Sequence, residues 1–142
     1  MIKIVIDNNV IIDALNPNPQ FESEAQQILR YASAEIIDGF INANSLTDIF
    51  YVLRKKHGAD KAKIMLQKLT VILNIIGIDP IDCIDALSLP MNDFEDALIA
   101  VCAQKIKADY IVTRDEKFLK ENTAVKIITP KQFIKETQTA IK

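Results

Sequence analysis

Residues 92–115 read NDFEDALIAVCAQKIKADYIVTRD, and this stretch decides the fold that the sequence predicts. Its first part predicts a helix over residues 92–107, capped by Asn92 with Glu95 at the third helical position. Apolar residues recur there at the spacing of one helical face. Residues 108–113 follow almost at once and predict an apolar strand. A helix that turns directly into a strand is typical of a parallel α/β sheet.

Three acidic residues meet in this arrangement. A helix of about 15 residues rises about 1.5 Å per residue, so it runs back along the following strand and starts near the strand's carboxyl end. Asp93 and Asp96 stand at the helix start, and Asp115 follows the strand. We therefore expect these three carboxylates to lie beside one another. The partial positive charge of the helix N-terminus favours their ionised form.

The rest of the chain repeats the alternation of strands and helices. The strand Ile2–Ile6 is closed by Asp7. Further strands are predicted over residues 36–42, 71–78 and 125–128, and further helices over residues 9–15, 21–32, 45–56, 60–69, 80–87 and from Pro130 onward. The expected fold is α/β, with a single domain over residues 1–137 and a frayed tail over residues 138–142.

A further acid belongs to the helix predicted over residues 45–56, where Ser45 and Asp48 have the spacing of a capping box. Right-handed connections bring the carboxyl ends of parallel strands to one edge of the sheet. The pattern therefore predicts one cluster of acids at that edge: Asp7, Asp48, Asp93, Asp96 and Asp115. Competing explanations are helix capping alone for Asp48, a favourable helix-dipole contact for Asp93 and a turn for Asp115.

Such a cluster is unstable without cations. Two carboxylates about 4 Å apart repel by roughly 4 kcal/mol at an effective dielectric of about 20, against a typical domain stability of about 5–15 kcal/mol. Oxygen ligands without nearby sulfur or imidazole favour Mg²⁺ or Mn²⁺ over Zn²⁺. The single histidine, His57, excludes a histidine-rich metal site. A divalent ion would activate water and neutralise charge that develops on phosphate oxygens.

These considerations assign roles to the polar residues at the predicted edge. The predicted catalytic residues are Asp7, Asp48, Asp96 and Asp115, with Asp7, Asp96 and Asp115 as the metal ligands. Three more residues are expected to support them: Asp93, Asn9 through a hydrogen bond to Asp7, and Thr113 through a hydroxyl that orients Asp115 or a water. No Ser-His-Asp or Cys-His arrangement competes with the acids.

The net charge of −2 argues by itself against a strongly nucleic-acid-binding surface. Setting aside the five site acids, however, leaves 17 basic residues against 14 acidic ones. The densest basic stretch contains Arg54 and Lys55, and Arg114 lies directly beside the predicted site. An acidic centre filled by metal with a basic rim suits a phosphodiester substrate. The competing explanation for the lysine and arginine cluster is an ordinary solvated helix face.

Composition limits the other possibilities. Cys83 and Cys102 are too few and too far apart to suggest a disulfide framework or a metal knuckle. No apolar run approaches the length of a membrane span, and polar residues interrupt the N-terminus before a signal-peptide core forms, so we expect a cytoplasmic protein. The hydrophobic share of 49% fits a sheet buried on both faces, either alone or together with an apolar surface for an oligomer or partner.

The chain resembles the PIN-domain ribonucleases, the fold of VapC-type bacterial toxins. The resemblance rests on the order and spacing of four segments: IVIDNNV at residues 4–10, DFEDALIA at residues 93–100, YIVTRD at residues 110–115 and ITPKQF at residues 128–133. It implies a three-layer α/β/α fold with a five-stranded parallel sheet in the order 3-2-1-4-5. It also implies hydrolysis of RNA with Mg²⁺ or Mn²⁺, a homodimer, and an antitoxin partner that places a basic side chain among the acids.

Two residues depart from the family pattern. Asp48 falls where the family usually has glutamate, which is one methylene longer, so coordination through water is expected there in place of direct coordination. Asn8 stands where the family often has threonine. The substitution at Asp48 supports a second hypothesis, a non-catalytic scaffold that binds RNA. A free-standing RNA-processing nuclease is a third.

A receiver-type phosphoacceptor domain also has a doubly wound sheet with an acidic pocket. Such a domain needs paired acids after the first strand, whereas Asn8 and Asn9 follow Asp7 here. It also needs a lysine after the fifth strand, whereas Thr129 and Pro130 stand there. The sequence therefore favours the metal-dependent nuclease.

Overall fold

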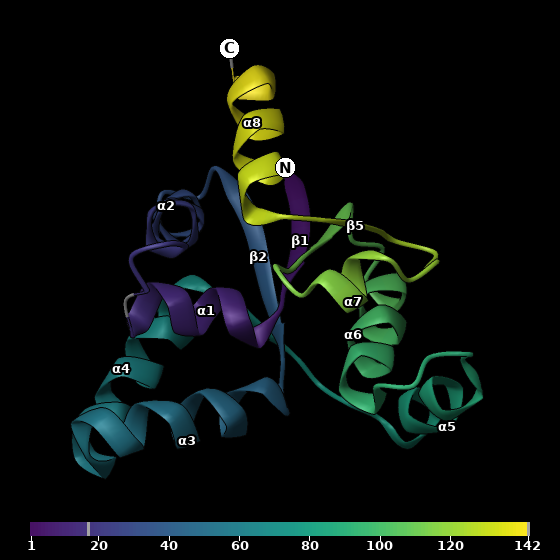
Figure 1. The fold of residues 1–142 in the computed structure, drawn as a ribbon, viewed down its shortest axis with the longest axis horizontal. Helices are drawn as coiled ribbons and strands as arrows, with labels where there is room; N and C mark the ends of the chain where they lie inside the picture. The colour runs from purple at the N-terminus through teal and green to yellow at the C-terminus, as the bar shows by residue number, and fades with distance from the viewer. Residues whose placement is uncertain (17, 142) are drawn as a thin grey trace.

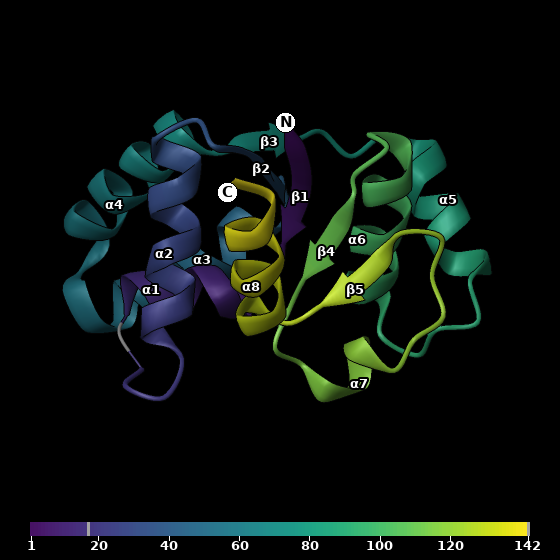
Figure 2. The same ribbon diagram turned by 90° about the horizontal axis from the view of Figure 1, so that it is seen from above.

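The computed structural model describes residues 1–16 and 18–141 and shows a five-stranded parallel sheet with helices on both faces (Figure 1, Figure 2). The sheet order is β3-β2-β1-β4-β5, from β1 (Ile2–Ile6), β2 (Ile37–Asn42), β3 (Asn74–Ile76), β4 (Tyr110–Val112) and β5 (Lys126–Ile128). The helices are α1 (Asn8–Leu15), α2 (Glu22–Ser33), α3 (Ser45–His57), α4 (Ala59–Ile72), α5 (Pro80–Ser88), α6 (Phe94–Lys105), α7 (Glu116–Leu119) and α8 (Pro130–Ile141). The predicted fold class and strand order are confirmed.

The central strand β1 is apolar throughout because helices cover both of its faces. Ile4 and Ile6 pack into a cluster with α1, α2, α3, α4 and α8. Val5, whose side chain points to the opposite face, packs with Ile99 and Cys102 of α6. Figure 1 shows α1–α4 on one side of the strands and α5, α6 and α7 on the other. Burial on both faces explains why the strand has no alternation of apolar and polar residues.

Helix α6 is buried on more than one side, which differs from the single apolar stripe predicted for it. One side packs on the sheet, and Ala97 and Leu98 pack against Ala86 of α5. Small residues such as Ala100 and Ala103 are almost fully buried between these layers. The start of α6 is thereby held rigidly over the carboxyl edge of the sheet.

The strands next to α4 and α6 are shorter than predicted. Helix α4 continues through Ile72, and Leu73 still donates its backbone N–H to the carbonyl of Leu69 at 2.9 Å. The β-branched Val71 therefore lies on a helix with 84% of its surface exposed, because local strand propensity is overridden by the continuing helix. Strand β4 begins only at Tyr110, after a turn in which Lys107 has a φ of 57°.

Two predicted helix caps are wrong by one residue. Asp93, and not Asn92, caps α6, because its carboxylate accepts the backbone N–H of Asp96 at 3.0 Å. Helix α3 follows Asn44, and Ser45 is already its first residue. The expected capping box of Ser45 with Asp48 is therefore absent.

The last helix has the reciprocal cap that the Thr129-Pro130 pair suggests. The hydroxyl of Thr129 accepts the N–H of Gln132 at 3.1 Å, and the side chain of Gln132 accepts the N–H of Thr129 at 3.0 Å. Helix α8 then runs through Ile141, so residues 138–141 continue the helix in place of the expected frayed tail, and Lys142 lies outside the described residues.

Helix α7 was not predicted. Across the part of the chain that the structure describes, no helix combines the length and apolarity of a membrane span.

Candidate active site

Asp7 lies at the carboxyl end of the central strand and caps α1. Its backbone is extended, with φ −72° and ψ 153°, and its Oδ1 accepts the N–H of Asn8 at 2.7 Å. Its Oδ2 accepts the hydroxyl of Thr113 at 2.7 Å and the amide of Asn9 at 3.3 Å. Only 7% of Asp7 is exposed. The carboxylate is therefore held in one orientation by three donors.

Thr113 joins the ends of β1 and β4. It is fully buried, and while its hydroxyl donates to Asp7 it accepts the backbone N–H of Asp115 at 3.1 Å. The side-chain amide of Asn9 also donates to this hydroxyl at 3.3 Å. The Oδ1 of Asn9 accepts the backbone N–H of Arg114 at 3.4 Å. The hydroxyl of Thr113 thus orients the carboxylate of Asp7. It was expected to orient the carboxylate of Asp115, but it contacts only the backbone N–H of that residue. Asn9 lies where the sequence places it.

The helix starts bring three more carboxylates to this edge. Asp93 caps α6, Asp96 occupies the first turn of α6, and Asp115 caps α7 by accepting the N–H of Lys117 at 2.9 Å. These acids open onto a cavity of about 500 Å³, called here the acidic cavity and lined by Met91, Asn92, Asp93, Asp96, Asp115, Lys117, Lys120 and Glu121. The juxtaposition derived from residues 92–115 is therefore present in the structure.

Asp48 stands at the margin of this group. It does not line the acidic cavity, and its Oδ2 accepts the side-chain amide of Asn8 at 3.0 Å. Asn8 thus links Asp48 to the carboxylate of Asp7, because its backbone N–H donates to Asp7 at the same time. The side-chain Oδ1 of Asn8 is buried without a hydrogen-bond partner among the described residues. Asn8 and Asp48, the two residues that depart from the family pattern, are thus hydrogen bonded to each other.

The carboxylates perturb one another. Burial, followed by repulsion from Asp93 and Asp7, raises the pKa of Asp96 from 3.8 to about 7. Burial also raises the pKa of Asp7, against the opposing effect of the hydrogen bonds from Thr113 and Asn8. In the absence of a cation, the site therefore retains protons near neutral pH.

Glu95 is the acid that the sequence interpretation missed, because it was treated only as a capping partner at the third helical position. A hydrogen bond with Asp48, then burial, raises the pKa of Glu95 from 4.5 to about 7. Glu95 thereby brings the start of α6 into contact with α3. Its position directly before Asp96 was the available signal, since adjacent acids at a helix start can reach neighbouring elements.

The oxygen-rich donor set fits a hard divalent cation, and the buried, unpartnered Oδ1 of Asn8 is a further candidate oxygen ligand. As the side chains stand, however, no three Asp, Glu, His or Cys residues in the described ranges converge closely enough to hold an ion. Binding would therefore require the carboxylates other than the fixed Asp7 to turn inward, or ligation through water. The candidate ligands remain Asp7, Asp96 and Asp115.

The basic residues are placed differently from the prediction. Arg54 and Lys55 lie at the end of α3, where their charged groups are 5.6 and 4.5 Å from the ring centroid of Tyr51, and they do not line the acidic cavity. Lys117 of α7 and Lys120, which directly follows that helix, line the cavity and were missed. The nearness of both to Asp115 in the sequence was the signal.

Arg114 is engaged within the protein. Its Nε and Nη2 donate to the two carboxylate oxygens of Asp13 at 2.5 and 3.1 Å. Its guanidinium carbon lies 4.3 Å from the ring centroid of Phe21. Asp13 is only 3% exposed, so the pair ties α1 to the loop after β4. Arg114 thus has a structural partner in addition to any contact with a substrate.

Comparisons with known proteins agree with this fold. The family model described as PIN domain matches residues 3–117. Ribonuclease VapC1 of Aquifex aeolicus (strain VF5) is 26% identical, and the match covers 96% of each chain. The crystal structure of VapBC2 from Rickettsia felis, bound to a promoter DNA fragment, matches with a TM-score of 0.67 at 19% identity, covering 91% of this chain and 98% of the other.

A toxin-antitoxin complex from Klebsiella pneumoniae matches with a TM-score of 0.68 at 22% identity, covering 89% of this chain and 97% of the other. These solved structures share the fold, and the family model spans the first strand, the acids at the start of α6 and Asp115 after β4. The chain therefore belongs to the PIN-domain family.

Proposed function

We propose that this protein is a divalent-metal-dependent endoribonuclease and the toxin of a toxin-antitoxin pair. The observation that carries the proposal is the group of Asp7, Asp96 and Asp115 at the carboxyl edge of the sheet, beside an open cavity, with the pKa of Asp96 raised to about 7. A hydrolytic role is also supported by the match to Ribonuclease VapC1. We infer a cytoplasmic site of action, where such an RNA substrate is found.

The residues divide the work of phosphodiester hydrolysis. When bound, Mg²⁺ or Mn²⁺ supplies charge neutralisation for the phosphate and lowers the pKa of water. Asp7 is held in one orientation by Thr113 and Asn9, so it can bind the ion without first losing rotamer freedom. Asp96 and Asp115 complete the set, and Asp48 acts at its margin through Asn8. Lys117 and Lys120 can attract the RNA backbone to the same cavity.

The test is cleavage of unstructured RNA oligonucleotides by the purified protein, with Mg²⁺, with Mn²⁺ and with chelator. Asp96→Asn should abolish cleavage, while Asp60→Asn, a matched change of an exposed acid at the start of α4, should leave it unchanged. Cleavage that survives both chelation and Asp96→Asn would refute the metal-site assignment. RNA binding without cleavage by the wild type would instead support the non-catalytic scaffold. That alternative is suggested by Asp48, which lies at the margin of the acids and is hydrogen bonded to Asn8.

The partner proposal follows from the unbalanced acids. A basic side chain, above all an arginine fork, can satisfy two carboxylates at once and offset their repulsion. Matching structures are described as complexes of toxin with antitoxin. Expression of the gene within its native operon should yield a complex with a small co-purifying protein, in which RNA cleavage is inhibited. A protein that purifies alone and cleaves freely would favour the RNA-processing nuclease.

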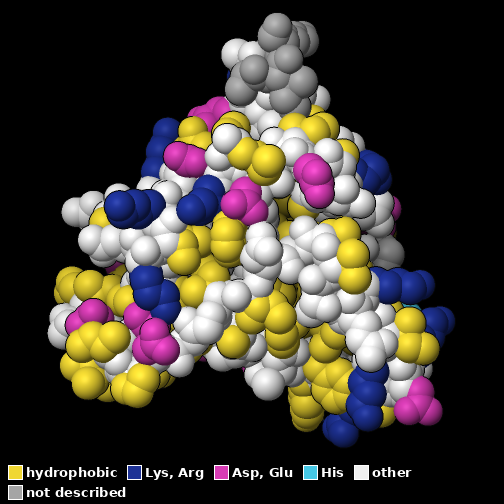
Figure 3. Space-filling view, turned by 180° about the vertical axis from the view of Figure 1, so that it is seen from behind, with side chains coloured by type: hydrophobic (Ala, Val, Ile, Leu, Met, Phe, Trp, Pro, Cys, Tyr) yellow, Lys and Arg dark blue, Asp and Glu magenta, His cyan; other side chains and the backbone are white. Residues whose placement is uncertain are grey.

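A homodimer is supported by apolar side chains on one exposed helix face. Ile81, Ile84 and Leu87 of α5 are 58%, 61% and 72% exposed. Figure 3 shows hydrophobic side chains gathered over this helix, at the lower left. Burial of such a row against a second copy removes it from water. Light scattering at tens of micromolar protein decides this, and Ile84→Lys should shift a dimer toward monomer.

A further inference from the structure

A second cavity lies next to the acidic cavity, on the other side of α7. Its volume is about 440 Å³, and it is bounded by the start of α2, by α7 and by the start of α8. Helix α7 separates the two cavities, because Glu116 and Leu119 line the second one while Lys117 and Lys120 line the acidic one. Consecutive residues, Arg114 and Asp115, belong to the two cavities, and their Cα atoms are only about 3.8 Å apart.

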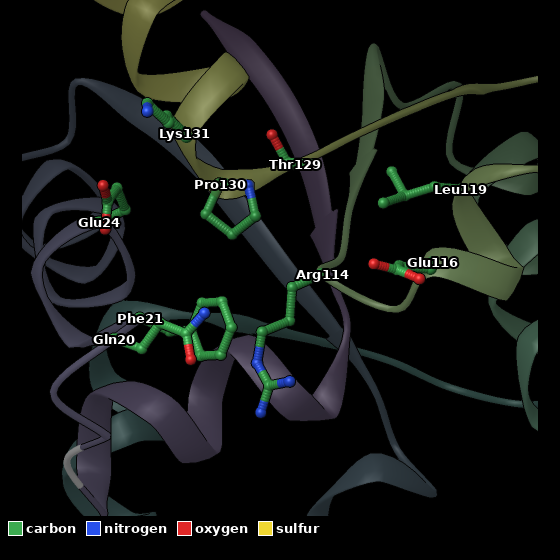
Figure 4. Close-up of a pocket in the computed structure, with 9 residues that line it drawn as sticks. All are labelled: Gln20, Phe21, Glu24, Arg114, Glu116, Leu119, Thr129, Pro130 and Lys131. Atoms are coloured by element: carbon green, nitrogen blue, oxygen red, sulfur yellow. The ribbon is translucent and has the colours of Figure 1, made fainter.

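The wall of this second cavity, called here the Phe21 cavity, has a flat apolar part. Phe21, Leu119 and Pro130 line it, and Figure 4 shows the rings of Phe21 and Pro130 beside the same hollow. Arg114 packs on Phe21 and is fixed there by the carboxylate of Asp13. An aromatic ring and a guanidinium plane are the surfaces on which unstacked RNA bases pack.

The charges of the Phe21 cavity select against a phosphate. Glu24 and Glu116 line it, and neither has an ion-pair partner among the described residues. The two cations are Lys131 and Arg114, and Asp13 already offsets the latter. A phosphate in this cavity would therefore meet a net negative charge. A neutral ligand with several N–H donors is the better complement.

We propose that the Phe21 cavity binds a nucleobase, guanine in preference to the others, of the nucleotide next to the phosphate that lies in the acidic cavity. This inference rests on the proposed ribonuclease function. The N1–H and N2–H of guanine can both donate to one carboxylate, and the half-buried Glu24 offers that carboxylate. Its O6 and N7 accept from a lysine or arginine, as Lys131 and Arg114 offer. Uracil has a carbonyl acceptor on each side of its single ring N–H. These acceptors would face the carboxylate, which repels them.

Binding can be measured without cleavage. The full-length protein in chelator is titrated with 2′-O-methylated dinucleotides, which differ only in one base, while amide resonances are followed by NMR. The guanine-containing dinucleotide should shift the amides of Phe21, Glu24 and Arg114 and should bind about tenfold more tightly than its uracil counterpart. Phe21→Leu should weaken binding of the dinucleotides by about tenfold whichever base they carry, because stacking on the ring is lost.

The matched pair of variants is Glu24→Gln and Glu22→Gln, which remove one carboxylate two residues apart on α2. Only Glu24 lines the cavity, so only its variant should lose the guanine preference. Equal affinity for guanine and uracil, an unchanged preference in Glu24→Gln, or tighter binding of an arginine-containing peptide at the same amides would overturn the proposal.

Cleavage mapping on random-sequence RNA separates this inference from the function on which it rests. Guanosine should be enriched beside the cut in the wild type and in Glu22→Gln, and not in Glu24→Gln. Cleavage with no such enrichment would refute the base site and leave the ribonuclease intact. A wild type that cuts no RNA yet binds the guanine dinucleotide through Phe21 and Glu24 would refute the ribonuclease and support base binding by the cavity.

Discussion

Asp96→Asn should stabilise the metal-free protein at neutral and higher pH. Asp96 is 9% exposed, and burial together with the surrounding acids raises the pKa of its carboxyl from 3.8 to about 7. Each pKa unit corresponds to about 1.36 kcal/mol, so ionising Asp96 in the folded state costs about 4 kcal/mol. Asparagine has nearly the same volume and removes this charge. No hydrogen bond to the Asp96 carboxylate is present among the described residues, so the change loses none.

The pH dependence has a defined sign. Below about pH 4 the carboxyl is protonated in both the folded and the unfolded chain, so it costs nothing. As the pH rises from about 4 to 7, the unfolded chain ionises first and the folded protein loses stability relative to it. Above about pH 7 the whole penalty is present. Glu95 and Asp7 can release protons when Asp96 is neutralised, so we expect a net gain of about 1–3 kcal/mol.

Thermal denaturation in chelator measures this gain. For a chain of this size, about 1–3 kcal/mol corresponds to a rise in Tm of about 3–10 °C, expected near pH 8 and absent near pH 4. Asp60→Asn is the control, because Asp60 is exposed and lies outside the site. With millimolar Mg²⁺ the order should reverse, because the wild type gains binding energy that the variant lacks. Equal Tm values near pH 8, or a gain of the same size at both pH values, would refute the electrostatic argument.

Three further predictions concern the contacts around the site. Thr113→Val should lower RNA cleavage and cost about 1–3 kcal/mol in urea unfolding, because the buried carboxylate of the first strand loses its 2.7 Å donor, whereas Thr113→Ser should restore both. Arg114→Gln should cost about 3 kcal/mol, because it leaves Asp13 buried without its charge partner, and Asp13→Asn in the same chain should recover most of the loss. Carbon-13 NMR should show Glu95 titrating with a midpoint of about 7, and Asp48→Ala should lower that midpoint; an unchanged midpoint would contradict the Glu95–Asp48 contact.

Local pattern was sufficient for the order of the elements other than the short helix α7, and for the edge at which the acids meet. Apolar runs and helical spacing depend on nearby residues, and right-handed parallel connections leave few ways to arrange the resulting elements. Asp7, Asp93, Asp96 and Asp115 could be placed together in this way because each directly follows a strand or opens a helix. Errors arose at element ends, where α4 continues through Ile72 because its backbone hydrogen bonds outweigh the strand propensity of its β-branched residues.

The pairing of side chains was decided only by the tertiary structure. Asp48 bonds to Asn8 across 40 positions of sequence, and Arg114 bonds to Asp13 across 101. Such partners depend on the packing of α1, α3 and the β4–α7 loop to within a fraction of the length of a side chain, and no local periodicity records that distance. Sequence alone therefore determined that carboxylates gather at the carboxyl edge. Packing determined which oxygens are already engaged, which acid retains a proton, and that a second cavity opens beside them.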